Sequence, residues 1–156
     1  LQVTDVPGFD FRAVNRAGNV AIDVEAYPAN AHLLPRLDQL TPGIRNNMEE
    51  AAAITAEAAA AANRARQDLR DWFSAALVRH QVLALPALTG APPLIGERMS
   101  ATILTVPANL AGLPALVLPV PGGQAGLPAS LQLIGPPGGE EQLLALGRVI
   151  EAALPG

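Results

Sequence analysis

Cysteine and lysine are both absent from the 156 residues. Without cysteine, the chain can form no disulfide, no thiolate nucleophile and no cysteine-ligated metal site of its own. Because its ten basic side chains are all arginine, a mechanism that needs a lysine cannot operate within this chain. Aromatic residues are also scarce, at three Phe, one Tyr and one Trp, which predicts a core of Ala, Leu, Val and Ile without aromatic stacking platforms.

Charge and histidine content exclude further classes of function. The formal net charge is −4 and the arginines are scattered, a pattern that disfavours direct nucleic-acid binding. His32 and His80 lie far apart in the chain and offer no metal-ligand spacing, and each is more typical of a structural residue than of a catalytic base. No glycine-rich phosphate-binding motif occurs. We therefore expect no metal and no cofactor.

The N-terminal residues do not resemble a targeting signal. Residues 1–10 contain proline and aspartate, with no basic start and no apolar stretch of the kind that a signal peptide has. An initiator methionine is also missing, which suggests that the sequence starts partway through a longer protein. We expect a cytoplasmic location.

No charged residue occurs between Arg98 and Glu140. A membrane-spanning helix needs about 20 apolar residues, and residues 101–120 have that length. Proline and glycine would interrupt the hydrogen bonds of such a helix repeatedly, which lipid tolerates poorly. We therefore predict a buried interior of strands and tight turns and no membrane insertion. The interrupting residues are Pro107, Gly112, Pro114 and Pro119.

Helix signals dominate the first half of the chain. Apolar periodicity predicts a helix that begins after Asp10 as N-cap within residues 11–34 and that Pro28 limits, with irregular chain or a short helical turn at 27–40. Thr41 followed by Pro42 predicts the next helix start, and Thr55 predicts a second N-cap, which divides residues 42–79 into a short helix and a long one. A last helix is expected at about 139–154.

Three short apolar runs follow the helical half, at residues 82–86, 115–118 and 129–134. Unbroken apolar runs of this length are typical of strands that are buried on both faces. We expect Pro119 to end the second strand and Gly135 to end the third. The fold class predicted is therefore α/β, divided into residues 1–41, 42–80 and 81–156.

Four blocks in the second half carry a specific resemblance. Residues 105–115 (TVPANLAGLPA), 119–120 (PV), 126–128 (GLP) and 131–136 (LQLIGP) are similar, in the right order, to the C-terminal hallmark of the amidase-signature family. The similarity extends over residues 83–153, and residues 42–77 fit the helix that precedes the hallmark. The resemblance implies a mixed β-sheet flanked by helices, within one partial amidase-signature domain that covers residues 1–156.

In that family, amide bonds are hydrolysed through an acyl-enzyme by a serine, a second serine on a cis peptide and a lysine base. All three lie upstream of the matched region, so the resemblance assigns no catalytic residue to this chain. It implies two kinds of partner, namely the N-terminal amidase segment or a second copy bound through an exposed apolar face. A small amide is the substrate implied for the completed enzyme.

The hallmark residues are expected to have structural roles. Turns fixed by proline and glycine bring strands close together, and an asparagine amide satisfies neighbouring peptide groups. The residues in this class are Thr105, Asn109, Gly112, Pro114, Gly126, Pro128, Gln132 and Gly135.

Thr102 is the candidate substrate-binding residue. In the glutamine-using amidotransferase subunits of the family, an acidic residue three positions before the hallmark threonine binds the amino group of the substrate, and here that position holds Thr102. A neutral hydroxyl cannot form this ion pair, which favours an uncharged amide over glutamine. Further departures are Gln81, Val117 and Ser130. Two alternatives stay open, which are a non-catalytic remnant or interaction module and a glutaminase subunit of a transamidation complex.

We predict that the purified 156-residue chain hydrolyses no amide above background, because the catalytic serines and lysine implied by the resemblance are not in it. Ammonia release from a panel of small amides measures this. Turnover that survives repurification, and that a substitution within this chain abolishes, would contradict the prediction.

Overall fold

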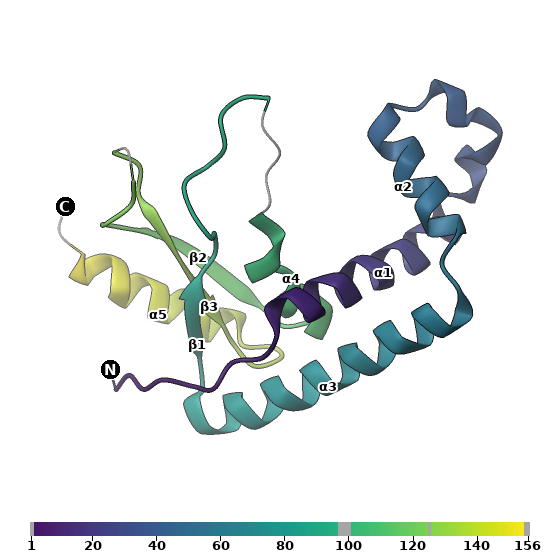
Figure 1. Cartoon of the computed structure of the whole chain (residues 1–156). Coiled ribbons are helices and arrows are strands. Elements are labelled where there is room, and N and C mark those ends of the chain that lie inside the picture. Colours follow the sequence, from purple (N-terminus) through teal and green to yellow (C-terminus); the bar gives the residue numbers. More distant parts are fainter. Residues whose placement is uncertain (1, 97–100, 125, 155–156) are drawn as a thin grey trace.

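The computed structural model describes residues 2–96, 101–124 and 126–154 (Figure 1). Helices fill the first half of the chain, and three strands with three further helices follow. The elements in order are α1 (Phe11–Ala29), the 3-10 helix η1 (Ala31–Gln39), α2 (Pro42–Ala52), α3 (Ala56–His80), β1 (Leu83–Pro86), the 3-10 helix η2 (Ala101–Leu104), α4 (Val106–Ala111), β2 (Ala115–Val120), β3 (Ala129–Ile134) and α5 (Glu140–Ala153).

The predicted N-cap of α1 is confirmed. Asp10 Oδ1 accepts hydrogen bonds from the backbone N–H groups of Arg12 at 2.9 Å and Ala13 at 3.0 Å. The bond from Ala13 is the main cause that lowers the pKa of the Asp10 carboxyl. Because this pKa is depressed on folding, the cap stabilises the protein above the unfolded pKa and is lost as the pH falls through the folded one. The helix ends at Ala29, one residue after Pro28.

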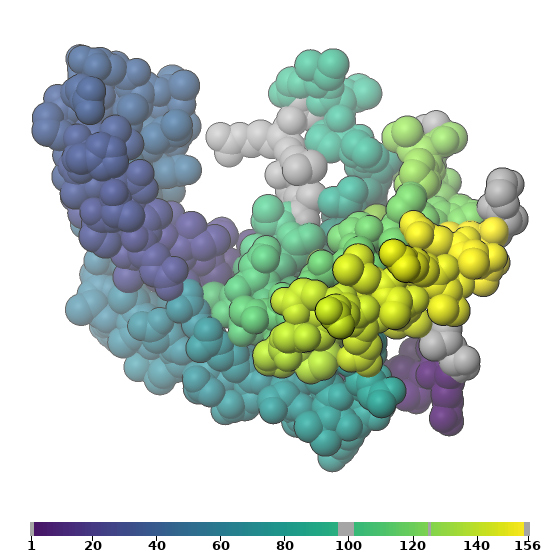
Figure 2. All heavy atoms as spheres, turned by 180° about the vertical axis from the view of Figure 1, so that it is seen from behind, coloured from purple at the N-terminus to yellow at the C-terminus, as the bar shows by residue number. Residues whose placement is uncertain are grey.

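The predicted division of the next helical segment is also confirmed. α2 begins at Pro42 after Thr41, whose side chain makes no cap hydrogen bond. Thr55 Oγ1 accepts a hydrogen bond from Ala58 N at 3.1 Å and so starts α3 as its N-cap. An arm made of η1 and α2 therefore projects from the α1–α3 pair, and Figure 2 shows it standing apart from the sheet.

The sheet has the order β1-β3-β2, and both pairings are antiparallel. Ile134 of the central strand lies opposite Leu83 of β1 and Ala115 of β2. The expectation of strands buried on both faces was wrong for β1 and β2, because Ala84 is exposed and Val117 is 49% exposed. The unbroken apolar run does not distinguish an edge strand covered on one face from a central strand.

Pro119 was expected to end the second strand, but β2 continues to Val120. Pro119 lies opposite Ser130 in the ladder. β2 is an edge strand of the sheet formed by the described residues, and an edge strand can accommodate a residue that has no N–H to donate.

Two apolar clusters hold the layers together. The larger one joins α1, α3 and α4 to the sheet through residues such as Leu69, Leu110 and Ile134. The smaller one lies beneath α5, where Gly147 allows the helix to approach Leu116 and Leu118 closely. Figure 1 shows α5 on one side of the sheet and α3 near the end of the sheet where β1 begins.

Aromatic side chains contribute more to the core than the composition predicted. Phe9, Phe11, Trp72 and Phe73 form one group, in which the ring centroids of Phe9 and Trp72 are 4.9 Å apart in an edge-to-face arrangement. Phe73 is fully buried. This group anchors the N-terminal segment to α3, so the few aromatic residues act together although they are distant in sequence.

The uncharged segment contains more helix than predicted. Instead of strands and tight turns alone, it forms η2 and the largely buried α4 before β2 and β3. Residues 99, 100 and 125 of this segment lie outside the described residues. Across the described parts of the chain, no helix combines the length and apolar character that crossing a membrane requires.

We predict that Gly18→Ala destabilises the protein by about 1–3 kcal/mol, because the added methyl would overlap Val106 Cγ1 and force α1 away from α4. Gly43→Ala in α2 is the matched control, since nothing lies within 4 Å of its added methyl. It should be neutral or stabilise by roughly 0.4–1 kcal/mol. Urea unfolding measures both, and equal stability of the two variants would contradict the close packing of α1 on α4.

Candidate functional site

The candidate substrate-binding residue lies in η2, shortly before α4. Thr102 Oγ1 donates to Asn15 Oδ1 of α1 at 3.3 Å. The carbonyl of Thr102 accepts from Thr105 twice, from the backbone N at 3.1 Å and from Oγ1 at 3.2 Å. Thr102 is exposed, so this turn of chain presents uncharged polar groups to solvent. We call residues 102–105 the threonine turn.

Gln132 supports the threonine turn from inside the protein. Its side chain, in the middle of β3, is 2% exposed, and Nε2 donates to Leu104 O at 2.9 Å. Among the described residues, Gln132 is the only polar one that is buried. An amide left unpaired at such a position costs about 1–3 kcal/mol. The hydrogen bond thus links the central strand to the last residue of η2.

Gly112 ends α4 in the left-handed conformation, with φ of 75°. Leu113 N donates back to Ala108 O at 3.0 Å, which is a helix-ending bond of the kind that this conformation allows. Arg70 of α3 donates Nε to Ala111 O at 3.2 Å and places a cation at the C-terminal end of the helix. Pro114 follows, and its carbonyl accepts from Gly135 N at 3.1 Å.

Of the remaining hallmark residues, Gly126, Pro128 and Gly135 lie in other parts of the fold, whereas the backbone N–H of Asn109 donates to Thr105 O of the threonine turn at 3.4 Å. Gly126, with φ of 76°, and the exposed Pro128 belong to the connection between β2 and β3. Gly135 follows β3, where an added methyl would meet the Leu143 side chain at 3.1 Å. Asn109 is on the exposed side of α4, and its side chain has no hydrogen bond to another described residue. The structural roles expected for these residues stay predictions.

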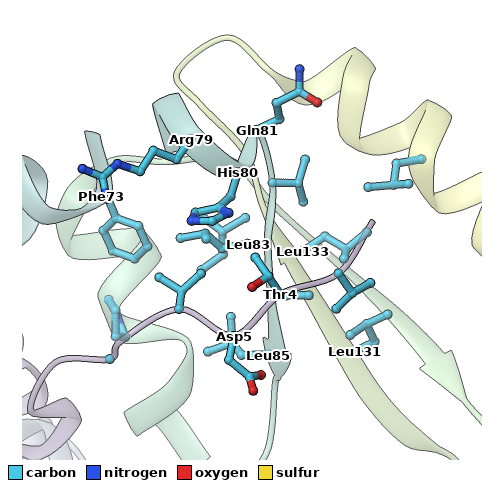
Figure 3. Close-up of a pocket in the computed structure, with 18 of the residues that line it drawn as sticks. Thr4, Asp5, Phe73, Arg79, His80, Gln81, Leu83, Leu85, Leu131 and Leu133 are labelled. Carbon is cyan, nitrogen blue, oxygen red and sulfur yellow. The ribbon is translucent and has the colours of Figure 1, made fainter. Parts of the chain in front are cut away.

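An apolar cleft of about 1180 Å³ lies beside β1, between the N-terminal segment and α5 (Figure 3). The N-terminal segment, β1, β3 and α5 provide its walls, with Leu85, Leu131 and Leu133 among the lining residues. His80 also lines it, but no described serine or threonine hydroxyl is hydrogen-bonded to this histidine. His32 is on η1, outside the cleft.

The titratable groups that the structure describes do not form a reactive cluster. Burial is the main cause that raises the pKa of Asp23 on α1, and the nearby Glu50 carboxylate raises it further. Glu25 is used in an ion pair with Arg66, at 2.8 Å from Oε1 to Nη2. Within the described ranges, no three His, Cys, Asp or Glu side chains are placed to hold a metal ion.

Sequence reasoning missed Asn15 and Arg70. Both lie within long helices, where a polar residue usually faces solvent. Each instead contacts a residue that is distant in the sequence, at a separation of 87 positions for Asn15 and 41 positions for Arg70. The signal for them would have been the packing of α1 against η2 and of α3 against α4, which no local pattern in the sequence contains.

We predict that Arg70→Met lowers the free energy of unfolding by about 0.5–1 kcal/mol, because the last carbonyl of α4 loses a cationic donor. Arg64→Met is the control, since Arg64 is an exposed residue of the same helix without a hydrogen bond to another described residue. Thermal unfolding of both variants would reveal the difference, and equal losses would show that the contact with Ala111 contributes nothing.

Known proteins resemble this chain in sequence and in fold. The family model described as Amidase matches residues 15–144. A glutamyl-tRNA(Gln) amidotransferase subunit of Nitrobacter hamburgensis is 40% identical over 96 residues, which are 56% of this chain and 19% of that protein. The corresponding chloroplastic/mitochondrial protein of Sorghum bicolor is 45% identical over 103 residues, which are 60% of this chain and 19% of that protein.

Among solved structures, an amidase crystal structure superposes with a TM-score of 0.82 and 28% sequence identity, over 93% of this chain and 36% of that one. The alignments with the curated relatives span about a fifth of their length. The predicted α/β class is confirmed. The family match also includes residues of α1, which lie outside the resemblance found in the sequence. Because the match covers most of its residues, the chain belongs to the amidase-signature family.

Proposed function

We propose that these 156 residues are the C-terminal part of an amide hydrolase, and that they form one partial amidase-signature domain. The observation that carries this proposal is the family match over residues 15–144, combined with the short span that the chain covers in its relatives. The completed enzyme cleaves C–N bonds through an acyl-enzyme. Its catalytic serine, cis-peptide serine and lysine come from polypeptide outside these residues. We also propose that the enzyme is cytoplasmic.

The role of this chain in such an enzyme is to form and support one wall of the substrate site. The threonine turn offers hydroxyl and amide groups, and Thr102 and Asn15 are already joined by a hydrogen bond. Neither side chain carries a charge. A neutral amide can exchange hydrogen bonds with this pair, whereas a substrate ammonium would find no carboxylate on it. An uncharged small amide is therefore the proposed substrate class.

The partner that completes the enzyme is proposed to be the N-terminal segment of an amidase. Several large apolar side chains of the sheet region are exposed, including Val117 and Leu127, and the cleft beside β1 is lined mainly by apolar residues, aliphatic and aromatic. Surfaces of this kind are typical of sites that another protein surface covers. The alternative partner is a second copy of this chain, bound through the same face.

A second candidate function is the glutaminase subunit of a transamidation complex. The kinship with the two curated relatives described above favours it, since both belong to a glutamyl-tRNA(Gln) amidotransferase. Thr102 argues against it, because the residue offers no charge to a glutamine ammonium. A non-catalytic remnant is the remaining alternative.

We predict that co-expression with the N-terminal two thirds of an amidase relative yields a complex that releases ammonia from propionamide in preference to glutamine. Thr102→Asp in this complex should shift selectivity toward glutamine by about 10- to 100-fold, because a charge-assisted hydrogen bond contributes roughly 1.5–3 kcal/mol. Thr102→Val is the control, which removes the hydroxyl without adding charge and should not improve glutamine hydrolysis.

The outcomes separate the alternatives. Wild-type preference for glutamine would support the glutaminase role and overturn the uncharged substrate. A stable complex with no hydrolysis of either amide would favour the remnant. Size-exclusion chromatography shows whether the chain pairs with the added segment or with a second copy, and exclusive self-association would contradict the proposed partner.

A further inference from the structure

Gln132 is a polar residue at a buried position where the surrounding core is apolar. It occupies the middle of β3, opposite Leu85 in β1 and Val117 in β2, and an apolar side chain of similar size would fill the same space. Burial of an amide is favourable only if its hydrogen bonds are replaced. The replacement here is the Leu104 carbonyl, which belongs to the short helix η2 rather than to the sheet. The amide thus ties a central strand to a less regular segment.

The threonine turn has two attachments of different character. On the outside, Thr102 meets Asn15 through a solvent-exposed hydrogen bond between the two side chains at 3.3 Å. On the inside, Leu104 O receives the Gln132 amide at 2.9 Å. The outer bond competes with water, so the inner bond is the stronger restraint on where the turn lies.

We infer that Gln132 is a positioning residue for the threonine turn, acting through the Leu104 carbonyl to hold Thr102 against Asn15. Its link to substrate rests on the proposed function. The restraint itself does not, because it can be measured in the 156-residue chain without any substrate. The hydrogen bond of Gln132 goes to the backbone of the turn and not to the Thr102 or Asn15 side chain.

Hydrogen exchange of backbone amides in the intact chain tests this inference. The reporters are the N–H groups of Thr105 and Asn109, which bond to Thr102 O and Thr105 O. Gln132→Met keeps the length of the side chain and removes the donor. We expect protection factors at both reporters to fall at least about tenfold, while those of Leu69 and Leu77 in α3 stay unchanged. Gln39→Met, at an exposed position of η1, is the matched control.

Gln132→Glu supplies a readout that space-filling alone would not change. A protonated carboxyl can donate to Leu104 O, whereas a carboxylate cannot. Because burial raises the pKa of a carboxyl, this variant should protect the reporters like wild type in acid and should lose protection as the pH rises through that pKa. Protection factors, which correct for the intrinsic pH dependence of exchange, give the comparison within one sample.

Two results would overturn the inference. One is unchanged protection of Thr105 in Gln132→Met, and the other is protection in Gln132→Glu that does not depend on pH. If Gln132→Met fails to fold, the pH comparison in Gln132→Glu decides alone. Failure of amide hydrolysis in the completed enzyme would overturn the proposed function and leave this restraint standing, so the two ideas fail separately.

Discussion

The structure depends on one central strand, β3, which is hydrogen-bonded on both sides. Its apolar residue Ile134 pairs with β1 and β2 at once and packs into the larger cluster, while Leu133, on the opposite face, packs beneath α5. Because side chains alternate along a strand, a shift of one residue would exchange these two faces. It would also move Gln132 away from Leu104. The register of this strand therefore fixes the core and the threonine turn together.

Local signals in the sequence predicted most of the helices. The caps at Asp10 and Thr55 are short-range chemistry, since each side chain bonds N–H groups two or three residues away. The apolar runs predicted where the strands lie. They did not predict how exposed each strand is, because burial depends on which strand lies at the edge of the sheet. α4 was missed as a helix since it is short and lies among residues whose prolines indicated turns.

The candidate site was less predictable than the fold. Thr102 and Gln132 were identified through resemblance, which gives positions along the chain and not contacts in space. Their partners Asn15 and Leu104 are brought to them by packing, at sequence separations of 87 and 28. A single sequence contains no local pattern for such pairs. The aromatic group around Phe73 was missed for the same reason.

The order of the strands has a consequence for how the chain folds. β2 and β3 are neighbours in the chain, so their ladder closes only a short loop, whereas β1 reaches β3 across all of η2, α4 and β2. Loop closure costs more entropy as the loop lengthens, and distant pairings form slowly. The β2–β3 hairpin should thus be the early event in sheet formation. β1 comes shortly after α3 in the chain and pairs with a hairpin that has already formed. A slow step in refolding would therefore report the docking of the helical half of the chain onto this hairpin.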